Sequence, residues 1–225
     1  MQPDIRIVHD PQATVGELLA EQAKRGGSIV LTGGSGVARA YRRAAERTPD
    51  WSRVTLWWGD ERCVPPDDEL SNYRLAKESL LDHLELQPRA VHRIRGEAPP
   101  AEAAAELDAA LEGIQLDFLL LGLGPDGHMA SLFPGSPQLE VADRRAVDGP
   151  PGLEPFVHRV TFTVPTIQSA VRIIFVASGE AKADAVARAF AGEVTPDVPA
   201  SLTRSAPVPV EVFLDEAAAA KIGTR

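Results

Sequence analysis

The stretch Asp117-Phe-Leu-Leu-Leu-Gly-Leu-Gly-Pro-Asp-Gly-His-Met-Ala-Ser-Leu-Phe-Pro-Gly135 combines a short apolar run with a long glycine-rich segment. The run Asp117–Leu121 is almost continuously apolar, which predicts a strand buried on both faces of a sheet. The glycines and prolines that follow predict a loop reaching Pro137. Ligands of open α/β sheets bind beyond the carboxyl ends of the strands. We therefore expect the chemistry of this chain to be centred on residues 117–137.

The same alternation of a short apolar run and a helical stretch extends in both directions along the chain. Buried strands are also expected at Ile5–His9, Ser28–Thr32, Val54–Trp58, Arg172–Ala177 and Val210–Leu214. Helices are expected at Val15–Lys24, Val37–Glu46, Asn72–His83, Ala101–Leu111, Glu180–Phe190 and Glu216–Ile222. A strand at His158–Val164 alternates polar and apolar residues and is expected to be more exposed. This order predicts an α/β fold with a mostly parallel, doubly wound (Rossmann-like) sheet and helices on both faces.

The length and composition fit one globular domain. A chain of 225 residues with 44% hydrophobic and 24% charged residues can form a single α/β core over residues 1–225. The Pro- and Gly-rich stretch Asp148–Pro155 is interpreted as a loop between two lobes, with a smaller lobe around residues 143–170.

The charge and the cysteine count narrow the classes of partner. A net charge of −9 argues against binding to nucleic acid or an anionic membrane surface. The lone Cys63 cannot form an internal disulfide, which favours a reducing cytoplasm. The N-terminus does not resemble a signal peptide, and no run of about 20 apolar residues suggests a membrane span. We expect a monomer or a small homo-oligomer, in which any anionic ligand is captured by a local basic cluster.

Two glycine-rich loops follow predicted strands. Thr32-Gly-Gly-Ser-Gly36 is interpreted either as a phosphate-binding loop before a helix or as a tight turn in which Ser35 caps that helix. It lacks the lysine of a nucleotide-triphosphate loop. Gly122-Leu-Gly-Pro-Asp-Gly127 matches the dinucleotide fingerprint, but Pro134 cuts the following helix short and the match lies in the middle of the chain. We therefore expect no nicotinamide or other cofactor.

His128 is the strongest candidate for acid–base catalysis. It follows the second glycine loop at the expected carboxyl edge of the sheet, and an imidazole titrates near neutral pH. The other histidines occupy positions without a comparable setting (His9, His83, His92 and His158). Asp126 is interpreted either as the residue that orients His128 or as a turn former after Pro125.

A charged cluster follows the strand Val54–Trp58. Asp60, Glu61 and Arg62 are interpreted as a surface ion-pair turn. Asp60 and Glu61 could also form a metal site with His128, but the sequence lacks the spacing of metal ligands and no metal is expected. Cys63 is expected to be a small, partly buried residue and not a nucleophile.

Taken together, these loops resemble the 6-phosphogluconolactonases, in the superfamily that also contains glucosamine-6-phosphate deaminase and ribose-5-phosphate isomerase. The resemblance covers nearly the whole chain. It is carried by the motifs Leu31–Gly36, Trp58–Arg62 with Val64-Pro65, Ser71-Asn-Tyr73, Gly122–Gly135, Arg159-Val-Thr161, Gly179–Ala183 and Pro199–Leu202.

Two motifs separate this chain from the deaminases. The chain reads Ala-Ser-Leu-Phe-Pro at residues 130–134, where deaminases resemble Phe-Asn-Glu-Pro, so their glutamate is absent. Gly59-Asp-Glu-Arg62 resembles the lactonase pattern and not the Asp-Glu-Tyr of the deaminases. Both differences favour a lactonase over a sugar-phosphate isomerase or deaminase. The presence of His128 and Arg62, without a helix-turn-helix or basic DNA-binding segment in this sequence, favours catalysis over a non-catalytic sugar-phosphate sensor.

The resemblance implies the hydrolysis of 6-phospho-D-glucono-1,5-lactone to 6-phospho-D-gluconate, the second step of the oxidative pentose phosphate pathway. It implies His128 as general base and Arg62 near the reacting end. In the mechanism that we expect, Asp126 or Asp60 orients or stabilises the His128 imidazolium. It implies a substrate-phosphate site formed by Gly33, Gly34, Ser35, Gly36, Arg159 and Lys182. Hydrolysis of an activated ester requires water, a base and oxyanion stabilisation, but no covalent nucleophile.

Overall fold

The computed structural model describes residues 2–34 and 36–223 and contains a central sheet of seven parallel strands. The strand order is β1 (Asp4–Ile7), β10 (Val210–Leu214), β9 (Ile173–Ala177), β6 (Phe118–Gly122), β2 (Gly27–Leu31), β3 (Val54–Trp58) and β5 (Ala90–His92). All positions of β3, β9 and β10 are buried, which explains why apolar runs predicted them. The predicted parallel α/β sheet is confirmed.

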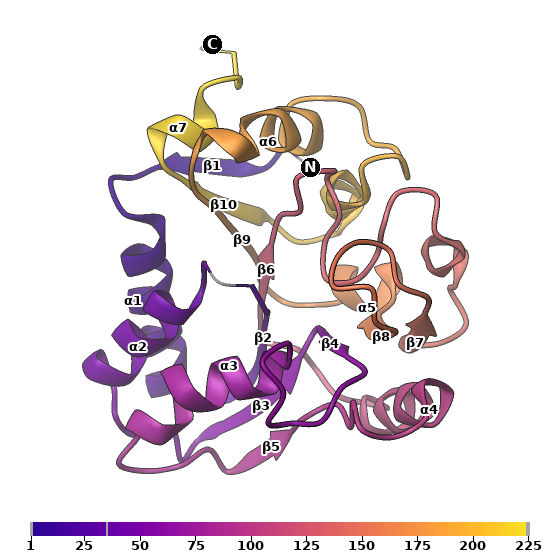
Figure 1. Ribbon diagram of the computed structural model, residues 1–225. Helices are drawn as coiled ribbons and strands as arrows, with labels where there is room; N and C mark the ends of the chain where they lie inside the picture. The colour runs from indigo at the N-terminus through magenta and orange to yellow at the C-terminus, as the bar shows by residue number, and fades with distance from the viewer. Residues whose placement is uncertain (1, 35, 224–225) are drawn as a thin grey trace.

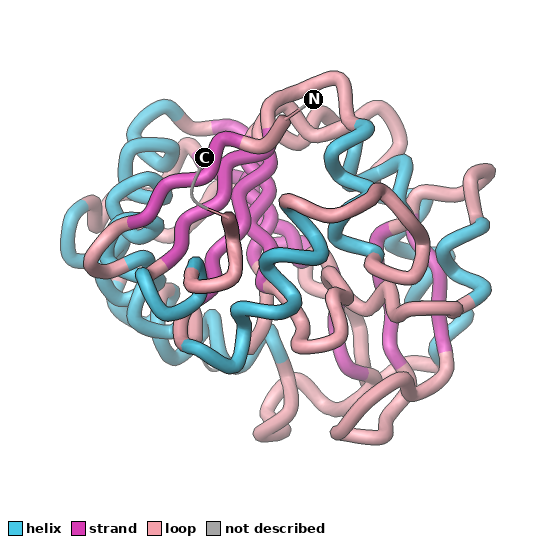
Figure 2. Tube along the Cα trace, turned by 90° about the horizontal axis from the view of Figure 1, so that it is seen from above, coloured by secondary structure: helices cyan, strands magenta, loops and turns pink. Residues whose placement is uncertain are grey.

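Helices cover both faces of this sheet (Figures 1 and 2). Figure 1 shows α1 (Pro11–Arg25), α2 (Ala38–Arg47) and α3 (Asn72–Ser79) on one side, and α4 (Pro100–Ala110) and α5 (Val164–Gln168) on the other. Two further helices, α6 (Ala183–Phe190) and α7 (Glu216–Ala219), pack together near β10. Short 3-10 helices complete the chain at Leu81–His83, Pro137–Glu140, Glu180–Lys182 and Pro199–Ser205. In the described part of the chain, no helix has the length and apolar character needed to cross a bilayer.

The order of the strands creates a switch point between β2 and β6. These strands are neighbours, but the chain proceeds from β2 to β3 and β5 on one side, and from β6 to β9 and β10 on the other. The loops that follow β2 and β6 therefore lead away from each other and leave a crevice at the carboxyl edge, where ligands of such sheets bind. These are the two glycine-rich loops singled out in the sequence.

A second sheet, of three antiparallel strands, lies beside the carboxyl edge of the central sheet. It is ordered β4 (Asp60–Arg62), β8 (Arg159–Phe162) and β7 (Ala146–Gly149). The expectation that the strand around 158–164 would be exposed is wrong, because β8 is the central strand, α4 packs against it and all four of its residues are buried. The chain from Asp60 to Arg62 was expected to be part of a loop, but pairing with β8 makes it a strand.

Several predicted helices are shorter than expected. The helix expected at Asn72–His83 ends at Ser79, because the backbone of Leu80 (φ −127°, ψ −67°) leaves the helical region before a 3-10 turn begins. The helix expected at Glu180–Phe190 starts as a 3-10 turn, and the last helix ends at Ala219. The single-domain organisation stays a prediction.

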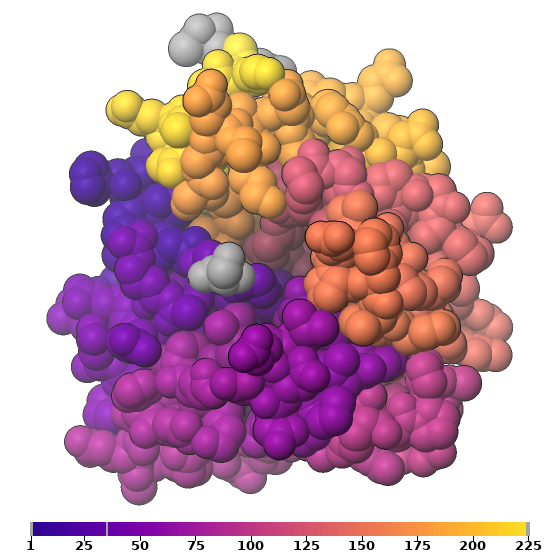
Figure 3. Space-filling model, viewed as in Figure 1, coloured from indigo at the N-terminus to yellow at the C-terminus, as the bar shows by residue number. Residues whose placement is uncertain are grey.

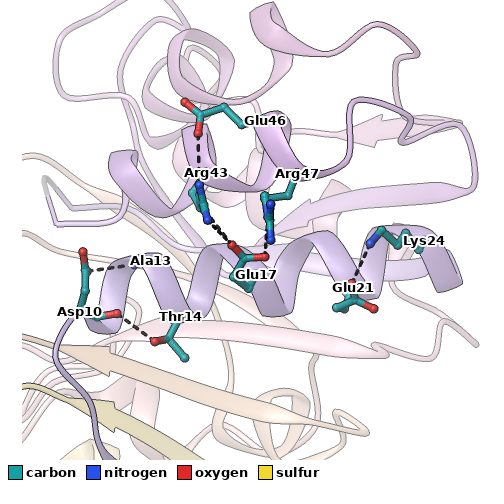
Figure 4. Close-up of polar contacts among 9 residues, drawn as sticks. All are labelled: Asp10, Ala13, Thr14, Glu17, Glu21, Lys24, Arg43, Glu46 and Arg47. Carbon is teal, nitrogen blue, oxygen red and sulfur yellow. Dashed lines mark hydrogen bonds and ion pairs between the residues drawn. The ribbon is translucent and has the colours of Figure 1, made fainter.

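Helices α1 and α2 are held together as one unit. Glu17 of α1 accepts hydrogen bonds from Arg43 (2.8 Å) and Arg47 (2.9 Å) of α2 (Figure 4). At Gly16 the helices approach so closely that an added Cβ would lie 2.7 Å from Cβ of Arg43. The start of α1 is fixed by Asp10, whose carboxylate accepts a hydrogen bond from the Ala13 N–H (3.0 Å).

Candidate active site

A cleft of about 390 Å³ opens at the switch point of the sheet. Figure 3 shows the surface hollowed between the purple N-terminal segments, the rose middle of the chain and the orange residues beyond 150. Eight of the predicted site residues line this cleft: Gly33, Gly34, Gly36, Asp60, Arg62, His128, Arg159 and Lys182. Asp126 reaches it through its contact with His128, and Ser35 lies outside the described residues.

The loop after β6 holds His128 in one orientation. Its Nδ1 lies 2.6 Å from Oδ1 of Asp126, and the same oxygen accepts a hydrogen bond from the His128 backbone N–H (3.0 Å). Gly124 lets the ring lie against the backbone, since an added Cβ would overlap the imidazole. The ring of Phe133 packs on the imidazole, with 4.7 Å between centroids. Asp126 therefore contacts both the backbone of the turn and the imidazole, and its role in orienting His128 stays a prediction.

Asp60 belongs to a separate hydrogen-bonded group. Its carboxylate accepts a 2.6 Å hydrogen bond from the Ser131 hydroxyl, and its carbonyl accepts one from the Asn72 amide (2.9 Å). The side chain is only 6% exposed, although it lines the cleft. Asp60 is thus held by neutral donors, whereas Asp126 contacts the histidine.

The Glu61 carboxylate points toward the start of α3. It is 2% exposed and accepts hydrogen bonds from the backbone N–H groups of Asn72 (2.7 Å) and Tyr73 (2.8 Å). Burial raises the pKa of Glu61, and these N–H donors oppose that shift. The interpretation of residues 60–62 as a surface ion-pair turn is therefore wrong. Within the described ranges, no three His, Cys, Asp or Glu side chains are grouped to hold a metal ion.

Arg62 and Arg159 occupy opposite positions in the β4–β8 ladder. Arg62 donates to the carbonyl of Leu70 (2.6 Å), and Arg159 donates to the carbonyls of Pro155 (3.0 Å) and Val157 (3.2 Å). Burial, together with the positive charge of Arg62, lowers the pKa of Arg159. Among residues 2–34 and 36–223, neither guanidinium forms an ion pair with a carboxylate. The cleft therefore contains two cations whose charge is available to an anion.

Lys182 adds a third cation from the segment after β9. Its ammonium donates a 2.6 Å hydrogen bond to the carbonyl of Leu123, directly after β6. Burial lowers the pKa of Lys182, while the charge of Asp126 acts in the opposite direction. Lys182 thus connects the β9 side of the cleft to the loop that holds His128.

The loop after β2 leads directly into the N-terminus of α2. The N-cap of α2 is Val37, whose side chain makes no capping hydrogen bond. Gly34 has a positive φ of 96°, a conformation that favours glycine. The Tyr41 hydroxyl accepts from the N–H of Thr32 (2.9 Å) and donates to its carbonyl (2.5 Å), which fixes the end of β2 against α2. N–H groups at such a helix start are suited to binding an anion.

The cleft also contains residues that were not predicted as site residues. Gln12 and Asn72 line it, and Ser131 contacts it through Asp60. Asn72 and Ser131 stood within quoted motifs, whereas no pattern in the sequence singled out Gln12. Cys63 is half-buried beside the cleft, and burial raises its pKa to about 11, which disfavours the thiolate that a nucleophile would need.

Sequence and structure comparisons relate this chain to known proteins. The profile of the family described as "Glucosamine-6-phosphate isomerases/6-phosphogluconolactonase" matches residues 8–210 of the chain. The chain belongs to this family. It is 37% identical over 216 residues to the 6-phosphogluconolactonase of Mycobacterium tuberculosis, covering 88% of this chain and 87% of that one. It is 36% identical over 208 residues to the 6-phosphogluconolactonase of Streptomyces coelicolor, covering 84% and 80%.

Two solved structures share the whole fold. The 6-phosphogluconolactonase of Trypanosoma brucei has a TM-score of 0.82 at 26% identity, covering 99% of both chains. A monomeric glucosamine-6-phosphate deaminase has a TM-score of 0.84 at 21% identity, covering 98% of this chain and 100% of that one, which shows the fold alone.

Proposed function

We propose that this protein hydrolyses 6-phospho-D-glucono-1,5-lactone to 6-phospho-D-gluconate in the cleft between the loops after β2 and β6. The observation that carries the proposal is the pairing of His128 with Asp126 at 2.6 Å in a cleft lined by Arg62, Arg159 and Lys182. An acid–base group and an excess of cationic side chains in one cleft suit a phosphorylated ester. The similarity to 6-phosphogluconolactonases at 36–37% identity supports the same reaction.

The contact with Asp126 defines the proposed role of His128. An ionised carboxylate only accepts hydrogen bonds, so Nδ1 of His128 carries the proton and Nε2 has a free lone pair. In our mechanism, Nε2 takes a proton from water as the water oxygen attacks the lactone carbonyl carbon. The imidazolium then gives that proton to the ring oxygen as the C–O bond breaks. Asp126 stabilises the imidazolium between these two steps.

The cations divide into two proposed groups. Arg62 stabilises the oxyanion that forms on the attacked carbonyl, since preorganised donors are most effective where charge develops. The loop from Gly33 to Gly36, with Arg159 and Lys182, binds the phosphate, and Ser35 is proposed as part of the same site. Binding at this remote end orients the carbonyl for attack.

The deaminase reaction is not favoured. The segment after His128 has Ala130, Ser131 and Leu132 where the deaminase pattern carries a glutamate, and Leu132 is fully buried. The Ser131 hydroxyl is engaged by Asp60. A binding protein without activity would not need the ordered pair of His128 and Asp126.

A coupled assay tests the proposed function. Fresh lactone is supplied, and 6-phosphogluconate is followed with its dehydrogenase above the background of spontaneous hydrolysis. His128→Ala should lower kcat by about 10²- to 10⁴-fold. The matched control is His83→Ala, because His83 is exposed and outside the cleft. No rate above background for the natural sequence, or full turnover by His128→Ala, would contradict the proposal, as would ammonia release from glucosamine 6-phosphate in place of lactone hydrolysis.

The compartment, oligomeric state and partners of this protein are also proposed. We propose a cytoplasmic enzyme of one domain that acts as a monomer or small homo-oligomer, without nucleic-acid partners. The lone half-buried Cys63 and the net charge of −9 support these assignments.

A further inference from the structure

The imidazole of His128 packs against one aromatic ring, that of Phe133. The two ring centroids lie 4.7 Å apart, and the ring planes are tilted by 50°. Phe133 is only 8% exposed, and it is not among the described residues that line the cleft. Phe133 therefore contacts the histidine without being placed to contact a molecule in the cleft.

A tight turn fixes the backbone of Phe133. Its carbonyl accepts a hydrogen bond from the N–H of Ser136 (3.1 Å). Pro134 and Gly135 occupy the two central positions of this turn, and Gly135 has a positive φ of 69°, a sequence and a conformation that favour a tight turn. The turn therefore limits the positions that the Phe133 side chain can take relative to His128.

A segment from later in the chain, residues 152–157, lies against the Phe133 ring, and we call it the strap. A Cβ added to Gly152 would lie 2.3 Å from Cδ2 and 2.5 Å from Cγ of Phe133. The backbone of the strap is thus in direct contact with the ring. Glycine permits this approach, because any larger residue at position 152 would overlap the ring.

Arg159 attaches the strap to β8. Arg159 is 5% exposed and belongs to the central strand of the second sheet. Its guanidinium donates three hydrogen bonds to carbonyls of the strap, those of Leu153 (3.3 Å), Pro155 (3.0 Å) and Val157 (3.2 Å). Contacts therefore run without a break from Arg159 through the strap to Phe133 and on to the imidazole.

We propose that Phe133 is a positioning residue for His128, and that the strap keeps the Phe133 ring in contact with the imidazole. This inference rests on the proposed function, in which His128 is the base. One contact, from Nδ1 to Asp126, leaves the imidazole free to tilt about that contact, and packing against Phe133 removes this freedom. Phe133 acts through His128 and takes no part in proton transfer or phosphate binding.

The first test uses Phe133→Leu, which removes the ring but keeps an apolar side chain. Phe190→Leu is the matched control, because Phe190 of α6 is also buried and packs on an aromatic ring, that of Phe175 (5.0 Å), outside the cleft. Phe133→Leu should lower kcat about 10- to 100-fold, since a small displacement of a catalytic group is costly. KM, and the Kd of 6-phosphogluconate from calorimetry, should stay within about twofold.

Gly152→Ala tests the strap independently. The new methyl group should displace the Phe133 ring and lower kcat by a similar factor, again with little change in KM. Gly152→Ala combined with Phe133→Leu should lower kcat no further than Phe133→Leu alone, because leucine is smaller and leaves room for the methyl group. Gly223→Ala is the control, since its added Cβ would meet nothing within 4 Å in the described part of the chain beyond its chain neighbours.

NMR measures the orientation of His128 without any substrate. In the proposed mechanism Nδ1 carries a proton that faces Asp126, and a proton held in such a contact gives its own signal. His128→Ala identifies this signal by its loss. The signal should be lost to exchange with water in Phe133→Leu and kept in Phe190→Leu, and thermal unfolding of each variant reports on folding separately.

The inference and the proposed function fail in different ways. A kcat of Phe133→Leu equal to that of Phe190→Leu, a tenfold rise in its KM, or an unchanged Nδ1–H signal would overturn the role of Phe133. The natural kcat in Gly152→Ala, or a full second loss in the double variant, would overturn the role of the strap. If the natural sequence does not hydrolyse the lactone but Phe133→Leu alone loses the NMR signal, the proposed function fails and the positioning of His128 by Phe133 stands.

Discussion

The hydroxyl of Ser131 donates a 2.6 Å hydrogen bond to Oδ2 of Asp60, which joins the loop after β6 to the first residue of β4. These residues are 71 positions apart in the sequence. The bond connects the segment that carries His128 to the sheet that carries Arg62 and Arg159.

Ser131→Ala removes this connection. We expect the free energy of unfolding to fall by about 1–3 kcal/mol, because a buried carboxylate loses a hydrogen bond. Urea denaturation measures the change. Ser136→Ala is the control in the same loop: the Ser136 hydroxyl is buried with no hydrogen-bond partner in the described part of the chain, so its removal should cost less than about 0.5 kcal/mol. Equal losses in the two variants would show that the bond contributes nothing specific.

Gly124→Ala should displace the imidazole of His128, because the new methyl group would occupy the position of the ring. We expect a loss of about 1–3 kcal/mol in stability from overpacking and a fall of about 100-fold in turnover from the misplaced base. Gly59→Ala is the control, since the nearest atom to its Cβ would lie at an ordinary 3.6 Å. Wild-type turnover in Gly124→Ala would contradict the proposed geometry.

Asp126→Asn keeps the turn but removes the charge beside His128. The amide oxygen can still accept the backbone N–H, so the fold should be unchanged, while kcat should fall about 10- to 100-fold. Asp50→Asn provides a matched control, because Asp50 accepts the same type of backbone bond from Ser52 (2.9 Å) on an exposed turn outside the cleft. If kcat of Asp126→Asn equals that of Asp50→Asn, Asp126 serves only the turn.

Lys182 should give phosphate binding a dependence on pH. Burial lowers its pKa, so its charge is complete at low pH and is lost at a lower pH than the ordinary lysine value of about 10.4. The affinity for 6-phosphogluconate should therefore decrease as the pH rises through that lowered pKa. Lys182→Arg should bind equally well at neutral pH and keep its affinity in alkaline solution, because a guanidinium stays charged. Lys182→Ala should raise KM at neutral pH. Calorimetry from pH 7 to 10 measures these differences, and identical curves for lysine and arginine would rule out the role.

The central sheet could be predicted because the sequence of each main strand is a short, mostly apolar run. Val54–Trp58 and Val210–Leu214 were predicted with the bounds seen in the structure, since each is a mainly apolar run whose residues are all buried. The polar strand Asp60–Arg62 could not be found this way. It forms only because β8, about a hundred residues later, pairs with it.

In the site too, some residues could be predicted from the sequence and others could not. The positions of His128 and the three cations at the cleft could be predicted, because motifs mark these residues and because strand ends meet at one edge of a parallel sheet. Gln12 could not, since its place beside Gly36 depends on how closely α1 and α2 pack at Gly16. That contact is a property of two surfaces and leaves no pattern along the chain.

The facing arrangement of Arg62 and Arg159 has a consequence for the protein without its ligand. Two like charges are held across a ladder with no carboxylate paired to either in the described ranges, so the unliganded fold carries a repulsion that an anion relieves. An anion that binds there acts as the missing counter-ion and adds to the stability of the whole chain. The lifetime of the folded enzyme would then depend on the concentration of sugar phosphate around it.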